Sequence, residues 1–222
     1  LPLIGVLTMF EATLARCGDA EQFAASVIVT GTAHLEHVEK QASGALGTTV
    51  IVEPEAKNTA AAIALAAGRL PADAVMLVCP SDHHIADVAG FRAAAAAAAR
   101  LAAEDWLVAF GITATAPETG YGYIKRGEPL DGGYRVERFV EKPSLATAQS
   151  FLADGGYSWN GGIFAFRAGH FLAELARHRP ALAAHAAASV SGGSQVGNRF
   201  HPDPPGFGAI EPESVDYAGI EA

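Results

Sequence analysis

The amino-acid sequence predicts an α/β fold, Rossmann-like, with an open and mostly parallel sheet that is covered by helices on both faces. Short apolar runs alternate with longer helical segments through the first half of the chain. Each run is continuously apolar rather than alternating, as expected for strands that are covered on both sides. Half of the 222 residues are hydrophobic, which is enough for one large core without disulfide bonds.

The first half contains four apolar runs that we predict to be strands and three segments that we predict to be helices. The strands are expected at 26–30, 49–52, 75–79 and 107–111, and the helices at 32–40, 58–68 and 88–104. Asp87 stands just before the last helix and is a suitable N-cap. Repeated strand–helix–strand units give a doubly wound sheet, and ligands bind such sheets beyond the carboxyl ends of the strands.

The second half changes character. Residues 123–125 and 134–140 alternate more, which predicts a half-exposed hairpin around the turn Asp131-Gly132-Gly133. Further elements are expected in this order: a helix at 145–152, a strand at 162–166, and helices at 168–177 and 181–188. The segments 191–194 and 201–206 are rich in glycine or proline and are predicted to be irregular.

Charge and composition exclude several classes of partner. The formal net charge is −9 and no basic block is present, which argues against nucleic acid. The opening Leu1-Pro2-Leu3-Ile4 lacks a basic signal-peptide region, and the alanine-rich stretch 93–103 is too short to cross a membrane. Cys17 and Cys79 are expected to be buried free thiols rather than a disulfide. These observations predict a cytoplasmic protein without a membrane partner.

Polar residues follow the second and third predicted strands. Asn58 and Thr59 stand where strand gives way to helix, so free amides and a carboxamide would face the crevice; an N-cap without a ligand is the alternative. Asp82 follows the third strand and could hold Mg²⁺, or it could cap the next turn. His83 and His84 suggest zinc, but adjacent residues point apart and no further ligand stands at zinc spacing.

Two further motifs fit a sugar phosphate. Gly122 belongs to Glu118-Thr119-Gly120-Tyr121-Gly122-Tyr123-Ile124, where backbone amides can approach a ligand closely. Glu141 and Lys142 then offer a carboxylate for hydroxyls and an ammonium for phosphate, unless they are only a solvated charge pair. Asn160 could both donate to and accept from vicinal hydroxyls, unless Trp159-Asn160-Gly161-Gly162 is an ordinary turn.

Six sequence blocks together resemble one enzyme family, the mannose-1-phosphate guanylyltransferases, also called GDP-mannose pyrophosphorylases. The closest form is bacterial and often carries a fused mannose-6-phosphate isomerase domain. The blocks are Glu53-Pro54 with Asn58-Thr59-Ala60, Pro80 with Asp82-His83, Glu118 to Ile124, Val140 to Pro143, Trp159-Asn160 with Gly162, and Asp216-Tyr217.

The resemblance implies a glycosyltransferase-A-like nucleotidyltransferase fold over residues 1–222 and a reaction of GTP with mannose 1-phosphate that gives GDP-mannose and pyrophosphate. Mg²⁺ is the implied cofactor. The implied roles are nucleotide binding for Asn58, Thr59 and Asp82, metal binding for Asp82, sugar binding for Gly122, Glu141 and Asn160, phosphate binding for Lys142, and catalysis for Asp82 and Lys142. In-line displacement at the α-phosphorus needs alignment and charge neutralisation rather than a covalent intermediate.

The chain departs from the family at both ends. The glycine-rich phosphate loop expected before Leu1 and the second metal-binding aspartate expected after Asp216-Tyr217 are absent from the sequence. Either these parts exist and are mobile, or the chain is a fragment that is inactive alone. The first alternative function is a silent regulatory homologue that binds a sugar nucleotide. The second is an enzyme for glucose 1-phosphate with UTP or dTTP.

The sequence also bears on one further enzyme class and on the oligomeric state. A dinucleotide oxidoreductase shares the general fold, but no Gly-x-Gly-x-x-Gly follows a predicted strand. Sequence patterns do not count subunits, so a homodimer is an option that the residues leave open.

Overall fold

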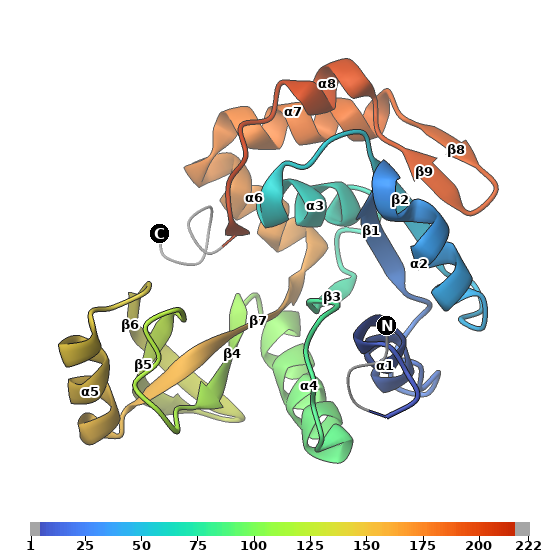
Figure 1. The fold of residues 1–222 in the computed structure, drawn as a ribbon. Coiled ribbons are helices and arrows are strands. Elements are labelled where there is room, and N and C mark those ends of the chain that lie inside the picture. The colour runs from blue at the N-terminus through green and yellow to red at the C-terminus, as the bar shows by residue number, and fades with distance from the viewer. Residues whose placement is uncertain (1–4, 216–222) are drawn as a thin grey trace.

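Two β-sheets frame the structure, a computed structural model that describes residues 5–215 (Figure 1). The first sheet has the strand order β1-β2-β9-β8. Its strands are β1 (Val27–Gly31), β2 (Thr49–Glu53), β8 (Ser194–Val196) and β9 (Arg199–His201). The pairs β1–β2 and β2–β9 are parallel, whereas β8 and β9 form an antiparallel hairpin.

The second sheet is antiparallel and is built around the long strand β7 (Tyr157–Arg167). Its order is β3-β7-β5-β6, and β4 pairs with the other edge of β7. The remaining strands are β3 (Val75–Val78), β4 (Val108–Thr113), β5 (Tyr123–Leu130) and β6 (Gly133–Val140). Because β7 pairs with three strands, it brings segments that are far apart in the sequence to one place.

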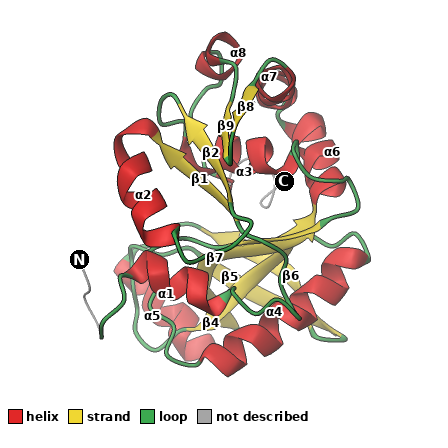
Figure 2. Cartoon of the chain, turned by 90° about the vertical axis from the view of Figure 1, so that its right-hand side faces the viewer, coloured by secondary structure: helices red, strands yellow, loops and turns green. Residues whose placement is uncertain are grey.

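Helices pack on these sheets from both sides, as Figure 2 shows for α4 on one side of the second sheet and for α3 and α6 on the other. The helices are α1 (Met9–Arg16), η1 (Thr32–His34), α2 (Leu35–Ala42), α3 (Asn58–Ala67), α4 (Val88–Ala103), α5 (Leu145–Asp154), α6 (Ala168–His178), α7 (Pro180–Ser191) and α8 (Pro204–Gly208).

The main hydrophobic core joins the two sheets through α3. Ile51 of β2, the alanines of α3, and Phe164 and Phe166 of β7 belong to one buried cluster. Alanine has the smallest side chain that still favours a helix, so an alanine-rich α3 can lie close to its neighbours without losing helix propensity. A second group packs α4 against the sheet through Ala98, Ala102 and Ala165. The α/β class with helices on both faces is therefore confirmed.

The structure differs from the expected single, mostly parallel sheet in how the strands are joined. Parallel pairing is found for β1, β2 and β9, whereas β3 and β4 pair antiparallel with β7. A continuous apolar run indicates that a strand is covered on both faces, but it does not indicate whether the neighbouring strands are parallel or antiparallel to it. The predicted strand positions are confirmed for β1 to β4 and for the hairpin β5–β6.

Local signals explain most helix boundaries. Asp87 is the N-cap of α4, as predicted, and its carboxylate accepts a hydrogen bond from the Gly90 amide at 2.8 Å. The prediction that 201–206 is irregular is wrong, because His201 ends β9 and Asp203 caps the short helix α8, which begins at Pro204. Two prolines fit there because the first turn of a helix does not need their missing N–H groups.

Some elements were not anticipated or begin earlier than predicted. Helix α1 begins with a capping box in which Thr8 and Glu11 bind each other's backbone amides. The hairpin β8–β9 follows α7, and only Gly192 and Gly193 separate α7 from β8. Strand β7 begins at Tyr157, five residues before the predicted start at 162, so the Trp159-Asn160 motif lies inside the strand.

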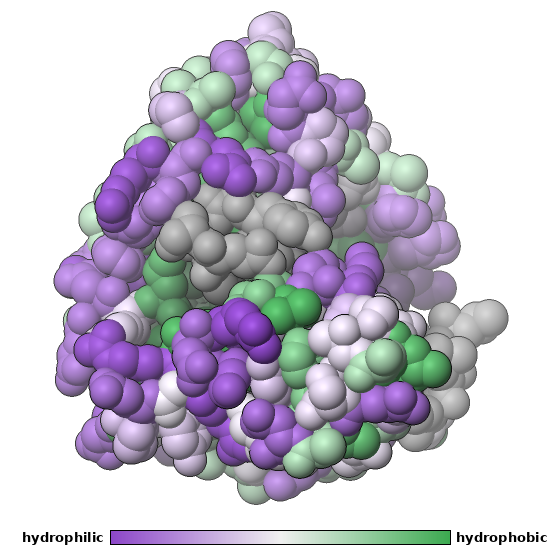
Figure 3. Space-filling view, turned by 90° about the vertical axis from the view of Figure 1, so that its left-hand side faces the viewer, coloured by the Kyte–Doolittle hydropathy of each residue, from purple (hydrophilic) through white to green (hydrophobic). Residues whose placement is uncertain are grey.

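Figure 3 shows one face of the molecule, where hydrophilic residues dominate and hydrophobic residues gather in patches near the middle. Within residues 5–215, no helix combines the length and the apolar character that a membrane crossing requires.

Candidate active site

A bulge in β7 sets the direction of Asn160. The pairing between β4 and β7 shifts between Ala109 and Gly111, so that extra residues of β7 are left out of the ladder. Gly162 adopts φ +62°, a left-handed conformation that suits glycine, and a Cβ on Gly161 would lie 3.0 Å from the Phe110 carbonyl oxygen. Bulges bend a strand and redirect its side chains, and they are common beside active sites.

Gly122 brings the predicted sugar-binding residues together. A Cβ atom on Gly122 would lie 2.6 Å from Oε2 of Glu141, 2.8 Å from Cζ of Phe139 and 3.3 Å from Cβ of Asn160. The backbone amide of Asn160 donates a hydrogen bond to the Gly122 carbonyl at 2.7 Å. Residues from β6, from the segments beside β5 and β6, and from β7 therefore meet at Gly122, where any larger residue would displace the Glu141 and Phe139 side chains.

Lys142 extends from this cluster toward solvent. Its backbone has φ +44°, and its amide donates to the Tyr121 carbonyl at 3.2 Å. Its side chain is 65% exposed, and Nζ lies 3.4 Å from Oε1 of Glu141. A left-handed conformation is unfavourable for lysine and persists only where the surroundings impose it, which is typical of functional sites. The ammonium group is thus held beside Glu141 with room for an anion.

Asp82 lies on the exposed segment after β3. Among residues 5–215 its carboxylate has no hydrogen-bond or ion-pair partner, and Asp87 rather than Asp82 caps α4. The same segment touches the β7 bulge, because a Cβ on Gly162 would lie 3.6 Å from Cγ of Pro80. The structure therefore leaves the Asp82 carboxylate accessible, four residues after the end of β3.

Asn58 and Thr59 stand at the start of α3 and are held by a different set of contacts. Asn58 has φ +68°, and its side-chain oxygen accepts a hydrogen bond from the Thr59 amide at 2.8 Å. The Thr59 hydroxyl accepts from the Val215 amide at 2.9 Å, and the Ala60 amide donates to the Glu213 carbonyl at 3.1 Å. The segment 213–215 thus occupies part of the helix N-terminus that sequence reasoning assigned to a ligand. The Asp216-Tyr217 block that follows lies outside the described residues.

Glu53 is a residue at this edge for which sequence reasoning proposed no role of its own. It ends β2, and its Oε1 atom is buried without a hydrogen-bond partner in the described chain. Burial raises the pKa of Glu53 to about 7. Buried carboxylates of raised pKa in a cleft are candidates for ligand contacts. The glutamate-proline pair directly after an apolar strand was the signal that could have identified it.

Trp159 adds a second buried polar atom without a partner. Its Nε1 is enclosed and has no acceptor within the described residues. The ring of Tyr121 meets the Trp159 ring edge to face, with centroids 5.4 Å apart. Trp159 packs against the cluster of Tyr123, Phe151 and Tyr157, and its buried N–H is an exception to the rule that indole N–H groups are paired when buried.

The residues present fit Mg²⁺ better than zinc. No group of three or more His, Cys, Asp or Glu side chains able to hold a metal occurs in residues 5–215, so His83 and His84 do not form a zinc site there. The accessible Asp82 carboxylate offers one hard oxygen ligand. Mg²⁺ is typically bound in this way, by one or two carboxylates with water and substrate phosphates completing the shell.

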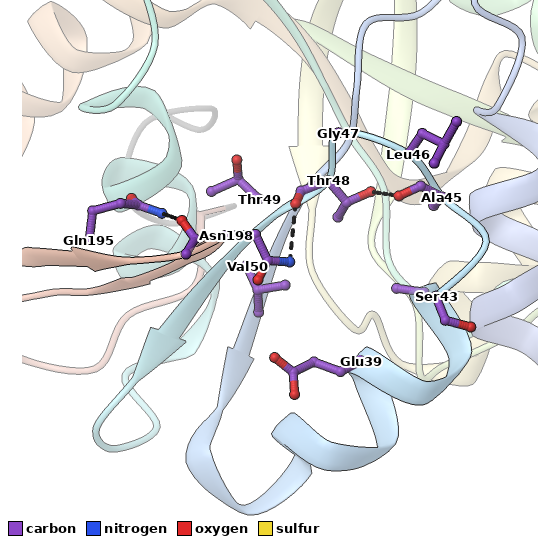
Figure 4. A pocket seen from close by; sticks show the side chains of 12 residues that line it. Glu39, Ser43, Ala45, Leu46, Gly47, Thr48, Thr49, Val50, Gln195 and Asn198 are labelled. Carbon is purple, nitrogen blue, oxygen red and sulfur yellow. Dashed lines mark hydrogen bonds between the residues drawn. The ribbon is translucent and has the colours of Figure 1, made fainter.

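One pocket of the described residues lies elsewhere. Its volume is about 430 Å³, and it opens between α2, the amino end of β2 and the β8–β9 hairpin (Figure 4). Thr48 and Val50 line it at the start of β2, whereas Glu53 ends that strand. Ligands of parallel sheets bind at the carboxyl ends of the strands, so this pocket is not the candidate site.

A family model described as nucleotidyl transferase matches residues 1–213. The chain belongs to this family.

Named relatives agree with this assignment. The chain is 43% identical over 225 residues to the xanthan biosynthesis protein XanB of Xanthomonas campestris pv. campestris (strain B100). The matched region covers all of this chain and 48% of XanB. It is 41% identical over 233 residues to the mannose-1-phosphate guanylyltransferase of Escherichia coli (strain K12), with 100% of this chain and 48% of the relative covered. The chain thus spans about half the length of these relatives.

A solved structure supports the same fold. The crystal structure of a mannose-6-phosphate isomerase from Helicobacter pylori matches with a TM-score of 0.90 and 29% sequence identity, over 100% of this chain and 87% of that one. The resemblance to mannose-1-phosphate guanylyltransferases that six sequence blocks indicated is confirmed by these matches, and so is the nucleotidyltransferase type of fold.

Proposed function

We propose that this nucleotidyl transferase transfers GMP from GTP to mannose 1-phosphate, giving GDP-mannose and pyrophosphate. The observation that carries the proposal is the cluster in which Gly122, Glu141 and Asn160 meet beside the ammonium group of Lys142. It combines a carboxylate and a carboxamide, which suit vicinal hydroxyls, with a cation that suits a phosphate. The identity to mannose-1-phosphate guanylyltransferases supports the choice of sugar and base.

In this proposal the sugar half of the site orients the nucleophile. Glu141 accepts hydrogen bonds from sugar hydroxyls, and Asn160 donates to or accepts from a neighbouring hydroxyl. Gly122 leaves room for the ring, and Lys142 neutralises charge on the sugar phosphate. A phosphate oxygen of mannose 1-phosphate forms a bond to the α-phosphorus of GTP, and the bond from that phosphorus to the pyrophosphate oxygen breaks. The nucleophile is already ionised at neutral pH, so no general base is needed.

The nucleotide half is proposed to consist of Asn58, Thr59 and Glu53, with Asp82 between the halves. When bound, Mg²⁺ would offset the negative charge of the phosphates, and Asp82 is the residue proposed to hold it. Guanine presents two adjacent donors, N1–H and the 2-amino group, which a carboxylate can accept together. The unpartnered oxygen of Glu53 supports its assignment to that role.

The proposal extends to the organisation of the chain. We propose one sugar-nucleotidyltransferase domain over residues 1–222, and the match of the nucleotidyl transferase model to residues 1–213 supports a single domain of that type. We propose that the protein is cytoplasmic. A measurement of its molecular size in solution would show whether it forms a homodimer.

The test is pyrophosphate release by the full-length protein with Mg²⁺, mannose 1-phosphate and, separately, GTP, UTP and dTTP. Release with GTP alone, and only when the sugar phosphate is present, is the expected result. Release with UTP or dTTP instead would mean that the enzyme uses a different nucleotide in the same type of reaction. Silence with all three nucleotides, while GDP-mannose still binds, would make the protein a regulatory homologue.

A further inference from the structure

The loop between β4 and β5 spans residues 114–122 and ends at Gly122, in the sugar half of the candidate site. Unlike Gly122, which is buried, the residues from Glu118 to Tyr121 are exposed. A Cβ atom on Gly120 would meet no heavy atom within 4 Å, so packing does not hold the middle of this stretch. Exposed loops with few packing contacts are mobile unless other contacts tie them down. The hydrogen bonds and ring contacts of this loop therefore determine its position.

Tyr123, the first residue of β5, anchors one side of the loop. Its ring is fully buried in a cluster with Phe151 of α5 and Tyr157 of β7, and the ring centroids of Tyr123 and Phe151 are 5.4 Å apart. Its hydroxyl donates a hydrogen bond to the Glu118 carbonyl at 2.9 Å and lies 3.5 Å from the Ala116 carbonyl. Because close packing fixes the ring, the hydroxyl is a rigid anchor for the backbone of the loop.

The other side of the loop holds Lys142. The Tyr121 carbonyl accepts a hydrogen bond from the Lys142 amide at 3.2 Å, and Lys142 has the unfavourable backbone φ of +44°. The Tyr121 ring meets the Trp159 ring edge to face. Two residues separate Glu118 from Tyr121 in the sequence. A displacement of the Glu118 carbonyl is therefore transmitted to the Tyr121 carbonyl and to the backbone of Lys142.

We propose that Tyr123 is a positioning residue for recognition of the sugar 1-phosphate, a role that rests on the proposed function. Its hydroxyl holds the Glu118 carbonyl, and the loop in turn places the Tyr121 carbonyl. That carbonyl keeps the Lys142 amide, and so the start of the side chain that carries the ammonium group, in place. Tyr123 is fully buried, so it acts through the loop rather than by contact with the substrate.

The matched variants Tyr123→Phe and Tyr157→Phe test this role. Each removes one hydroxyl from the same aromatic cluster and keeps the ring, but the Tyr157 hydroxyl accepts a hydrogen bond from Arg138 of β6. In the full-length protein we expect Tyr123→Phe to raise the KM for mannose 1-phosphate about tenfold, because the loop loses its anchor. The KM for GTP should stay within about twofold of wild type, and Tyr157→Phe should keep both KM values.

A merely structural role for Tyr123 predicts a different pattern. Destabilisation of the fold would lower the amount of active enzyme without separating the two KM values. Equal changes of the KM for GTP and for mannose 1-phosphate, or no change of either, would overturn the proposal. So would a Tyr157→Phe variant with the same selective increase as Tyr123→Phe.

Hydrogen exchange measured by mass spectrometry tests the same contacts without an activity assay. The peptide that contains Lys142 should exchange about tenfold faster in full-length Tyr123→Phe than in wild type, because the acceptor of its amide is no longer fixed. Tyr157→Phe should exchange like wild type at this peptide. Unchanged exchange at Lys142 in Tyr123→Phe would overturn the positioning role. A wild type that releases no pyrophosphate would instead contradict the proposed function, and the exchange result would still decide whether Tyr123 positions Lys142.

Discussion

The two halves of the candidate site are built in different ways. In the sugar half, residues in or beside strands β5, β6 and β7 pack closely together. A Cβ atom on Gly122 would lie 2.6 Å from Oε2 of Glu141. In the nucleotide half, Asn58 and Thr59 stand at the start of a helix, and Thr59 is hydrogen-bonded to Val215 from the other end of the chain. The first half is fixed by close packing in a sheet, and the second by single hydrogen bonds.

This difference predicts how substitutions in each half of the site affect function and stability. A methyl group added at Gly122 would displace the Glu141 carboxylate and the Phe139 ring. Because that carboxylate is one of the groups proposed to bind the sugar, the sugar half should lose function abruptly. A helix start that relies on individual hydrogen bonds should lose stability gradually, by about 1 kcal/mol for each bond removed.

Asp82→Asn tests the segment that lies between the halves. Asparagine keeps the shape but loses the charge that would hold a divalent cation, so pyrophosphate release should fall about 10³-fold at a fixed Mg²⁺ concentration. Asp87→Asn is the matched control, because asparagine caps α4 as well as aspartate does and activity should remain. An Asp82→Asn enzyme within threefold of wild type would remove Asp82 from the metal site.

Gly122→Ala tests the packed half. The new methyl would push Glu141 and Phe139 away, since it would lie 2.6 and 2.8 Å from their nearest atoms. A displacement of about 1 Å can reduce activity about 10²-fold, and we expect a loss of that size.

The neighbouring glycine supplies the control for that variant. A Cβ on Gly120 would meet no heavy atom within 4 Å, so Gly120→Ala should keep wild-type turnover. If both alanine variants lose the same activity, the loop tolerates no substitution and the Gly122 contact is not specific.

Thr59→Val tests the hydrogen-bonded half. The substitution removes the acceptor of the Val215 amide, and Val215 is only 2% exposed. An unpaired buried amide should lower the free energy of unfolding by about 1–3 kcal/mol, measured by urea denaturation. Thr59→Ser keeps the hydroxyl and should be much closer to wild type. Equal stability of the valine and serine variants would show that this hydrogen bond contributes nothing.

Glu53→Gln gives the smallest effect and a characteristic pH dependence. Burial raises the pKa of Glu53 from 4.5 to about 7, so between these pH values the folded protein keeps a proton that the unfolded chain has lost. The free energy of unfolding therefore falls as pH rises through this window and stays low above it. Glutamine cannot ionise, so at pH 8 the variant should be more stable by about 1 kcal/mol after allowance for solvent screening.

Thermal unfolding across pH checks this prediction. The gain should appear as a rise of about 2–4 °C in melting temperature at pH 8 that disappears at pH 4. Glu55→Gln, two residues along and largely exposed, is the control. A variant that melts like wild type at both pH values would mean that the Glu53 carboxylate is well solvated in the folded protein.

The sequence predicted those parts of the fold that depend on local signals. The apolar runs located β1 to β4, the glycine turn located the β5–β6 hairpin, and Asp87 marked the start of α4. The motifs also identified the residues that the structure brings together around Gly122. Local signals suffice there because periodicity, caps and turns act within a few residues.

Other parts depend on contacts that no local pattern records. The antiparallel pairing of β3 and β4 with β7 follows from topology, and the bulge at Gly161-Gly162 follows from the shifted ladder with β4. The hydrogen bond from Val215 to Thr59 joins segments that are far apart in the sequence. Glu53 could not be recognised as unpartnered, because its burial depends on the folded chain.

The most direct test of the two-part site is calorimetric binding of GTP with Mg²⁺ and of GDP-mannose to the full-length wild type, Gly122→Ala and Gly120→Ala. We expect Gly122→Ala to bind GTP like wild type but to bind GDP-mannose about tenfold more weakly or worse, since it loses hydrogen bonds to the sugar. Gly120→Ala should bind both ligands normally. Equal weakening of GTP and GDP-mannose by Gly122→Ala, or no weakening of GDP-mannose, would contradict it.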